Sequence, residues 1–150
     1  MVSASNAGGE SANSTPASAT LRPPAPSGLT ASPGNNQVAL SWTAASGATS
    51  YTLMRGTNLG GPYPTVVATG PGTSTTDTGL TNGTTYYYVV TASNGGGESG
   101  PSTEASAMPQ VAPPSAPTGL TAATTTSGDG PVALSWTASS GTVDSYSVKR

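Results

Sequence analysis

The chain repeats its own sequence with a period of about ninety residues, and no other feature constrains its fold as strongly. Residues 2–19 align without gaps on residues 90–107, with 13 of the 18 positions identical. The segment 38–55 returns with small changes at 132–150. A repeat of this length indicates tandem domains rather than a solenoid of short structural repeats.

The repeat predicts a division into three parts. Residues 23–109 form one complete domain, residues 1–22 are the C-terminal end of a preceding domain with its linker, and residues 110–150 are a linker and the N-terminal part of a following domain. We expect neither end segment to close a core alone, because a lone hairpin is marginally stable in water. The proline-rich linkers favour extended, semi-rigid spacing between domains.

The complete domain shows the pattern of short β-strands. In "QVALSWT" (37–43) the side chains of Val38, Leu40 and Trp42 fall on one face, and in "SYTLMR" (50–55) Tyr51 and Leu53 do the same. This alternation with a period of two is typical of half-buried strands. Clusters of Gly, Pro, Asn and Ser separate the strands at short intervals, which predicts an all-β sandwich of two sheets.

The composition excludes several classes of function. The chain has no Cys, His or Phe, only 7% charged residues and a net charge of −2. Thiolate and imidazole metal sites are therefore excluded, and we expect no cofactor. Clustered Lys and Arg are missing, so nucleic acid is not an expected partner, and no apolar run is long enough for membrane insertion. An activated nucleophile needs an adjacent base, and the chain has no His to act as one. We therefore expect no enzymatic activity.

Three stretches together resemble the fibronectin type III domain, in the form common in secreted bacterial proteins. They are the proline-flanked "PAPSGLTA" (24–31), the "VALSW" strand (38–42) and "LTNGTTYYYVVTASNGGGES" (80–99). The resemblance implies an immunoglobulin-like β-sandwich of seven strands in a tandem array. It also implies an extracellular or cell-surface location.

The resemblance assigns roles to residues at the start of the sixth strand. In the fifth strand the sequence departs from the family's pattern. Leu80, Gly83 and Tyr86 match the family's pattern at the start of the sixth strand, which implies that Tyr86 is the tyrosine corner, with its hydroxyl bonded to nearby backbone. Residues 73–78 offer only Thr where the family places an inward apolar side chain. We therefore expect the fifth strand to pack weakly.

The three consecutive tyrosines divide between two faces of a strand. Alternation places Tyr86, Tyr88 and Val90 on one face and Tyr87 and Val89 on the other. The expected core consists of the following residues: Leu40, Trp42, Tyr51, Leu53, Leu80, Tyr86, Tyr88 and Val90.

The other face carries a possible surface contact formed by Tyr87, Val89 and Met54 of the neighbouring strand. It is either a platform for a ligand or a set of cross-strand contacts that only stabilises the sheet. We favour the second interpretation, because the repeat places Lys149 where the complete domain has Met54.

Three local features are interpreted as turns. Asp77 is expected to bond to local backbone in a turn. The glycines at 95–97 are expected to supply positive φ for a hairpin. The Gly-Asp-Gly sequence at 128–130 lacks the further oxygen ligands of a calcium loop and is also interpreted as a turn.

These observations favour a non-catalytic spacer, display or adhesion module of a secreted or cell-surface protein. Two alternatives stay open: an accessory region of a secreted polysaccharide-degrading enzyme, and a segment of a self-assembling extracellular filament. The expected partners are neighbouring repeats, and either copies of the chain itself or extracellular polysaccharide.

Overall fold

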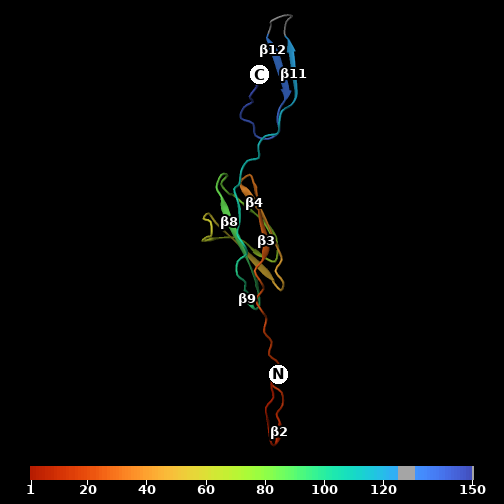
Figure 1. Cartoon of the computed structure of the whole chain (residues 1–150), viewed down its shortest axis with the longest axis vertical. Coiled ribbons are helices and arrows are strands. Elements are labelled where there is room, and N and C mark those ends of the chain that lie inside the picture. Colours follow the sequence, from red (N-terminus) through yellow and green to blue (C-terminus); the bar gives the residue numbers. More distant parts are fainter. Residues whose placement is uncertain (125–130, 150) are drawn as a thin grey trace. The chain divides into compact units, whose positions relative to one another are not determined.

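A computed structural model describes residues 1–124 and 131–149 of the chain. The turn expected at 128–130 therefore lies outside the described residues. The chain divides into two compact units, Met1–Pro109 and Gln110–Arg150. Figure 1 labels strands of both units, and the described ranges contain strands but no helix.

The first unit begins with a small exposed hairpin and continues into an antiparallel sandwich. The hairpin pairs β1 (Ser5–Asn6) with β2 (Gly9–Glu10). The strands of the sandwich are β3 (Ser27–Gly34), β4 (Gln37–Thr43), β5 (Ser50–Gly56), β6 (Thr65–Gly70), β7 (Ser74–Thr78), β8 (Tyr86–Asn94), β9 (Gly97–Glu98) and β10 (Ala105–Ala107).

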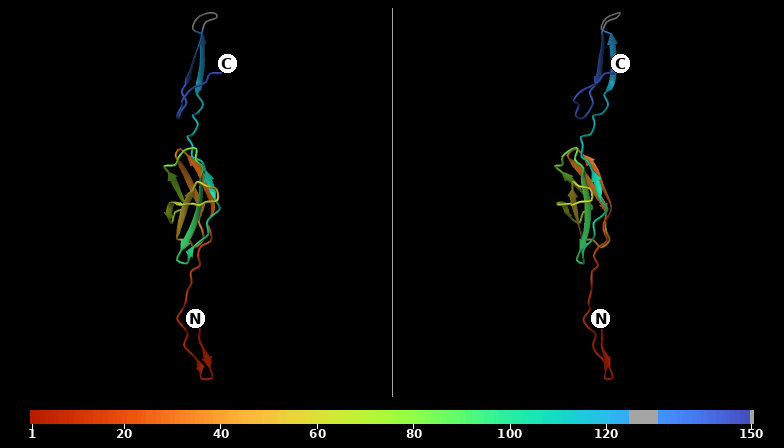
Figure 2. Two further views of the ribbon diagram at one scale, coloured as in Figure 1. Left: turned by 90° about the vertical axis from the view of Figure 1, so that its left-hand side faces the viewer. Right: turned by 60° about the vertical axis from the view of Figure 1, so that its left-hand side comes forward.

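Two sheets face each other in the sandwich, as the views in Figure 2 show. One sheet has the order β3-β4-β7, and the other has the order β10-β8-β5-β6, with the two-residue strand β9 added to β8. Every pairing is antiparallel. The predicted all-β sandwich of seven strands is confirmed, with β9 as a short extension.

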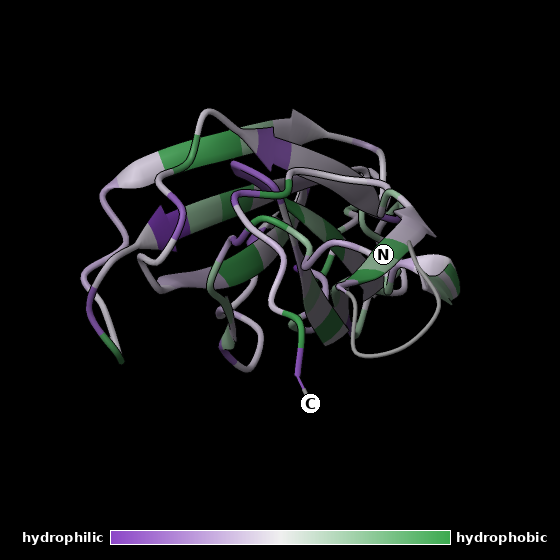
Figure 3. Cartoon of the chain, turned by 90° about the horizontal axis from the view of Figure 1, so that it is seen from above, coloured by the Kyte–Doolittle hydropathy of each residue, from purple (hydrophilic) through white to green (hydrophobic). Residues whose placement is uncertain are grey.

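Alternation along the strands produces the buried layer. In β4 every second residue is buried, and Val38 is fully buried. Figure 3 shows hydrophobic bands along the strands and few strongly hydrophilic ones, as a chain with so few charges requires. The outward positions of β4 are neutral residues that form the sheet surface without ion pairs, so hydrophobic burial is the main source of stability.

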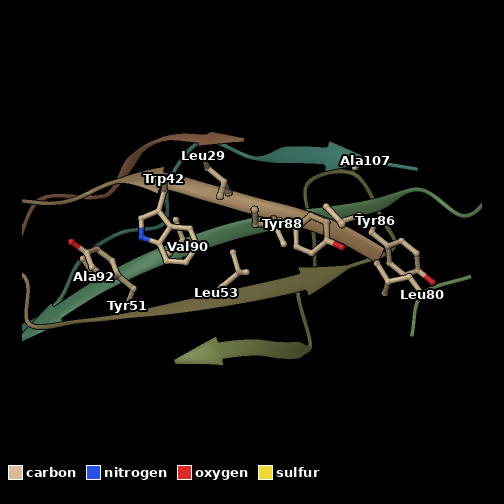
Figure 4. Close-up of a cluster of buried hydrophobic side chains, with 12 residues drawn as sticks. Leu29, Trp42, Tyr51, Leu53, Leu80, Tyr86, Tyr88, Val90, Ala92 and Ala107 are labelled. Atoms are coloured by element: carbon tan, nitrogen blue, oxygen red, sulfur yellow. The ribbon is translucent and has the colours of Figure 1, made fainter. Parts of the chain in front are cut away.

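The core runs the length of the sandwich. Figure 4 shows Trp42 and Tyr51 at one end, Leu80 and Tyr86 at the other, and Tyr88 between them. The eight residues expected in the core are all buried, and they are joined by Leu29, Val38, Ala92 and Ala107. The rings of Trp42 and Tyr51 meet edge to face with centroids 5.8 Å apart.

Tyr86 forms the corner that the resemblance implied. Its hydroxyl accepts a hydrogen bond from the backbone N–H of Thr81 at 3.1 Å. The guanidinium of Arg55 also lies over the Tyr86 ring, 5.2 Å from its centroid. The tyrosine therefore closes one end of the core and at the same time fixes the loop that precedes β8.

Asp77 is a buried strand residue, so its interpretation as a turn former was wrong. Its carboxylate accepts hydrogen bonds from Nη1 of Arg55 at 2.9 and 2.7 Å and from the Tyr88 hydroxyl at 3.0 Å. Arg55 and Tyr88 belong to the opposite sheet, so a polar contact ties β7 across the sandwich. This contact replaces the apolar anchor that residues 73–78 lack, since a buried charge is tolerated when it is paired.

The second unit is a single pair of antiparallel strands in the described ranges. Strand β11 (Thr118–Thr124) pairs with β12 (Val132–Thr137), with a register shift between Thr118 and Thr121. Nearly all of its residues are exposed, including Leu120 and Val132. Within residues 110–124 and 131–149, these two apolar side chains of the strands are left uncovered.

Candidate functional surface

The three residues of the predicted surface contact lie on neighbouring strands of the sheet that contains β5 and β8. Met54 of β5 is paired with Val89 of β8, and Gly56 is paired with Tyr87. Met54 and Tyr87 are half-buried, as a partly exposed sheet face allows. Val89, however, is only 4% exposed, so its expected place in a surface contact is wrong.

The loop of residues 57–64, here called the cover loop, folds back over this face. Gly56 has an outward position in β5, and a Cβ there would collide with the backbone carbonyl of Pro62. At its other side the loop reaches Glu104, whose Oε2 accepts hydrogen bonds from the Gly60 N–H at 2.9 Å and from the Tyr63 hydroxyl at 2.5 Å.

The two contacts of the cover loop lie on either side of β8. Gly56 lies on β5, and Glu104 directly precedes β10, so β8 lies between the two points at which the loop is held. A loop attached at both points must cross β8 near Tyr87 and Val89. Because Val89 is buried, a ligand platform on this face would lack its central apolar residue. Only Met54 and Tyr87 would remain, and both are half-buried.

The carboxylate of Glu104 controls the ionisation of Tyr63. The hydrogen bond to Glu104 raises the pKa of Tyr63 to about 12, with further contributions from burial and from the negative charge of Glu104. Tyr63 is thus a neutral hydrogen-bond donor at ordinary pH. Its role is to hold the loop against the sheet rather than to accept a proton.

Neither partner of this contact was predicted from the sequence. Tyr63 and Glu104 are separated by 41 residues, and neither stands in a recognisable motif. The one available signal was the Gly60–Gly61 pair between two predicted strands, because adjacent glycines mark places where backbone turns sharply or approaches other atoms closely.

Each carboxylate of the sandwich is hydrogen-bonded to partners of its own. Asp77 bonds to Arg55 and Tyr88, Glu104 bonds to Tyr63 and Gly60, and Glu98 accepts from the Thr91 hydroxyl at 2.5 Å. Burial, followed by the charge and hydrogen bond of Asp77, raises the pKa of Tyr88 above its ordinary range. Within residues 1–124 and 131–149, no three His, Cys, Asp or Glu side chains come close enough to hold a metal ion.

A small groove between β6 and β7 offers little for recognition. Its wall includes Trp42, Tyr51, Gly70 and Ser74. Both aromatic side chains are more than nine-tenths buried, so their faces are not open for stacking. Ligand sites usually combine accessible apolar surface with a few convergent polar groups, and this groove lacks the first.

The sheet order and the tyrosine corner define an antiparallel sandwich of the immunoglobulin type. The profile of the fibronectin type III domain matches residues 24–108, and the chain belongs to this family. In the described part of the chain there is no helix with the length and apolarity to cross a membrane.

Similar proteins include a curated enzyme and solved structures. A 64-residue stretch is 41% identical to an amylopullulanase of Thermoanaerobacterium saccharolyticum, covering 43% of this chain and 5% of that protein. An Fn3-like protein from Clostridium thermocellum is 44% identical with a TM-score of 0.52, covering 61% of this chain and 95% of that one. A beta-1,2-glucanase from Parabacteroides distasonis is 27% identical with a TM-score of 0.52, covering 63% of this chain and 14% of the enzyme.

Proposed function

We propose that the chain is a non-catalytic spacer segment of an extracellular protein that degrades polysaccharide. The observation that carries this proposal is the 41% identity to a stretch of an amylopullulanase, of which this chain spans one twentieth. The similarity to a minor part of a beta-1,2-glucanase supports it. In both relatives the shared domain is a small fraction of a much larger enzyme.

The chemistry of the sandwich supports a passive role. The cover loop lies on the face for which a ligand platform was the less favoured interpretation, and the carboxylates of the sandwich are engaged in contacts that hold the fold. Proline-rich segments at 22–26 and 113–117 flank the module and favour extended chain between neighbours. A stable domain between stiff linkers keeps its neighbours at a set distance.

The proposal includes a tandem arrangement. We assign residues 1–22 to the end of one fibronectin type III module and residues 110–150 to the linker and start of another. The support is the repeat itself, together with the matching local geometry of β3–β4 and β11–β12. The partners of such a segment are the neighbouring modules.

Binding to insoluble polysaccharide separates a spacer from an adhesion module. The purified chain and a Tyr87→Ala variant are incubated with insoluble starch or β-glucan, and the protein left in the supernatant is measured. We expect both proteins to stay in solution. Retention of the wild type that is lost in the variant, at an unchanged melting temperature, would establish adhesion instead.

The enzymatic context is tested on the parent protein. Its full reading frame is expressed with and without residues 23–109, and hydrolysis of soluble glucan is measured for both. We expect glucan hydrolysis in both proteins with the same kcat, because a spacer contributes no catalytic group. A parent protein without hydrolase activity contradicts the proposal.

A further inference from the structure

The segment that leads into the sandwich is held by the turn between β8 and β9. Nδ2 of Asn94 donates hydrogen bonds to the backbone carbonyls of Leu21 and Gly47, both at 2.9 Å. Its Oδ1 accepts from the Gly96 N–H at 2.8 Å. One side chain thus joins the entering segment, the β4–β5 turn and its own hairpin, and it uses both of its donor hydrogens to do so.

Gly96 provides space for the same segment. A Cβ on Gly96 would collide with the carbonyl oxygen of Thr20 and lie 2.7 Å from the carbonyl carbon of Leu21. Within the glycine run at 95–97 only Gly97 has a positive φ, of 125°. The expectation that the whole run supplies positive φ is therefore wrong. At Gly96 the glycine permits close approach of another backbone rather than an unusual conformation.

Asn94 and Gly96 meet the backbone of the entering segment. Leu21 as a whole residue is 86% exposed, and its carbonyl is bonded to Asn94. Further along the segment, Pro23 and Pro26 are buried. A contact of this kind does not depend on which side chains the segment carries, so linkers of different sequence can be held in the same way.

The preceding repeat carries the same two residues. Asn6 and Gly8 align with Asn94 and Gly96, and Oδ1 of Asn6 likewise accepts from the Gly8 N–H at 2.8 Å. The local turn that presents the amide donors is therefore built into the repeat. It recurs in an otherwise exposed hairpin, where it contributes nothing to a core.

We propose that Asn94 and Gly96 form a linker latch. The latch fixes residues 20–22 on the module into which these three residues lead. The latch sets the direction in which the chain joins the sandwich, so a module constrains the linker before it. This inference concerns the fold of residues 20–109 and is independent of any role in polysaccharide degradation. The latch is a binding site for backbone carbonyls at the end of the sandwich where the β4–β5 and β8–β9 turns lie.

Backbone ¹⁵N relaxation of residues 20–22 tests the latch in the full chain. In the wild type we expect order parameters near those of the sandwich, about 0.8, because rigid backbone gives about 0.85. In Asn94→Asp we expect values below about 0.6 at the same three residues. This variant keeps the oxygen that accepts from Gly96 but replaces both donors, and it places a carboxylate against two carbonyls.

A second variant separates the linker from the β4–β5 turn. Gly96→Ala keeps every hydrogen-bonding group of Asn94 and adds only the methyl group that meets the Thr20 backbone. We expect it to release residues 20–22 while the signals of residues 45–48 stay unchanged. Asn58→Asp, the same replacement of an amide by a carboxylate in the cover loop, is the matched control and leaves residues 20–22 rigid.

Each outcome decides for or against the latch. Release of residues 20–22 in both Asn94→Asp and Gly96→Ala, with β5 and β8 unaffected, supports it. Residues 20–22 that are as mobile as residues 15–18 in the wild type overturn it. Unchanged order parameters in both variants overturn it as well, because the segment would then be held by other contacts.

Discussion

The chain contains the same strand pair twice, as β3–β4 and as β11–β12, and the two copies share their local structure in detail. Both have a register shift two residues into the first strand, next to a glycine with φ of 62° or 64°. The hydroxyls of a cross-strand Thr–Ser pair lie 2.9 Å apart in one copy and 2.8 Å apart in the other. The tryptophan of each copy also meets a tyrosine edge to face, at 5.8 and 5.4 Å.

The copies differ in what covers them. Val38 is fully buried, whereas its counterpart Val132 is 58% exposed. Leu29 is 9% exposed, whereas Leu120 is 68% exposed. In the sandwich, the second sheet supplies the partners of β3 and β4. Hydrogen bonds and side-chain pairs within a hairpin therefore set its shape, while its burial depends on strands that lie far away in the sequence.

Hydrogen exchange should show the largest difference between the two copies. Amides of β4, β5 and β8 exchange only through unfolding of the sandwich, whereas those of β11 and β12 exchange through local opening. We expect protection to differ by about a thousandfold or more, given the usual stability of a small domain. Equal protection of residues 118–124 and 132–137 in a proven monomer would contradict the comparison.

Truncation of the two tryptophans should give the next largest contrast. Trp42→Ala should cost about 3–5 kcal/mol of unfolding free energy, as loss of a large core aromatic does. Trp136→Ala should change it by less than about 0.5 kcal/mol, because the second hairpin adds no buried core. Both values come from chemical denaturation of the purified chain. A Trp42→Ala protein that melts within a few degrees of wild type would show that the core is misplaced.

Substitution of the buried Asp77 tests whether its polar contact replaces apolar packing in β7. Asp77→Ala leaves the Tyr88 hydroxyl and the Arg55 guanidinium without their acceptor, and we expect a loss of about 2–3 kcal/mol. Thr76→Ala, an exposed position on the same strand, is the control and should stay within about 0.5 kcal/mol. Similar stabilities for both variants in urea denaturation would mean that the contact between the sheets contributes little.

Removal of a hydroxyl from each tyrosine of the paired rings sharpens the comparison further. The Tyr51 hydroxyl accepts from the Ala45 N–H at 2.9 Å, and the Tyr146 hydroxyl accepts from the Ser139 N–H at the same distance. Tyr51→Phe should cost about 1 kcal/mol, because its partner is partly buried. Tyr146→Phe should leave the thermal midpoint unchanged. A larger loss of stability in Tyr146→Phe than in Tyr51→Phe would contradict the conclusion that the sandwich, and not the second hairpin, is the stable folded unit.

The smallest effect concerns the cover loop of the sandwich. The pKa of Tyr63 is raised from 10.0 to about 12 in the folded chain, so the unfolded chain loses this proton first as the pH rises. The stabilisation from this group is complete below pH 10 and is lost as the pH rises through about 12.

An NMR titration of the Tyr63 ring measures this shift directly. Glu104→Gln should move the midpoint back toward 10, because it removes the carboxylate that raises the pKa. The hydrogen bond to the amide oxygen remains possible, so the loop keeps its path. A midpoint that is the same in both proteins would show that Glu104 does not control Tyr63.

The sequence by itself determined the fold class and the faces of the strands. Alternation in β4 and β8 needed no knowledge of neighbours, because a pleated strand sends successive side chains to opposite sides. The inward positions of Trp42, Tyr88 and Val90 therefore follow from the pattern alone. The tyrosine corner at Tyr86 followed from the resemblance of its local motif.

Only the tertiary structure decided which outward positions stay open and which polar groups are buried. Val89 has an outward position, yet it is only 4% exposed, and Tyr63 is bonded to Glu104 from a distant part of the chain. Asp77 stands in a stretch that resembles a turn, yet its partner Arg55 lies 22 residues earlier in the chain and on the opposite sheet. Periodicity describes one strand at a time, whereas such contacts depend on which distant segments the fold brings together.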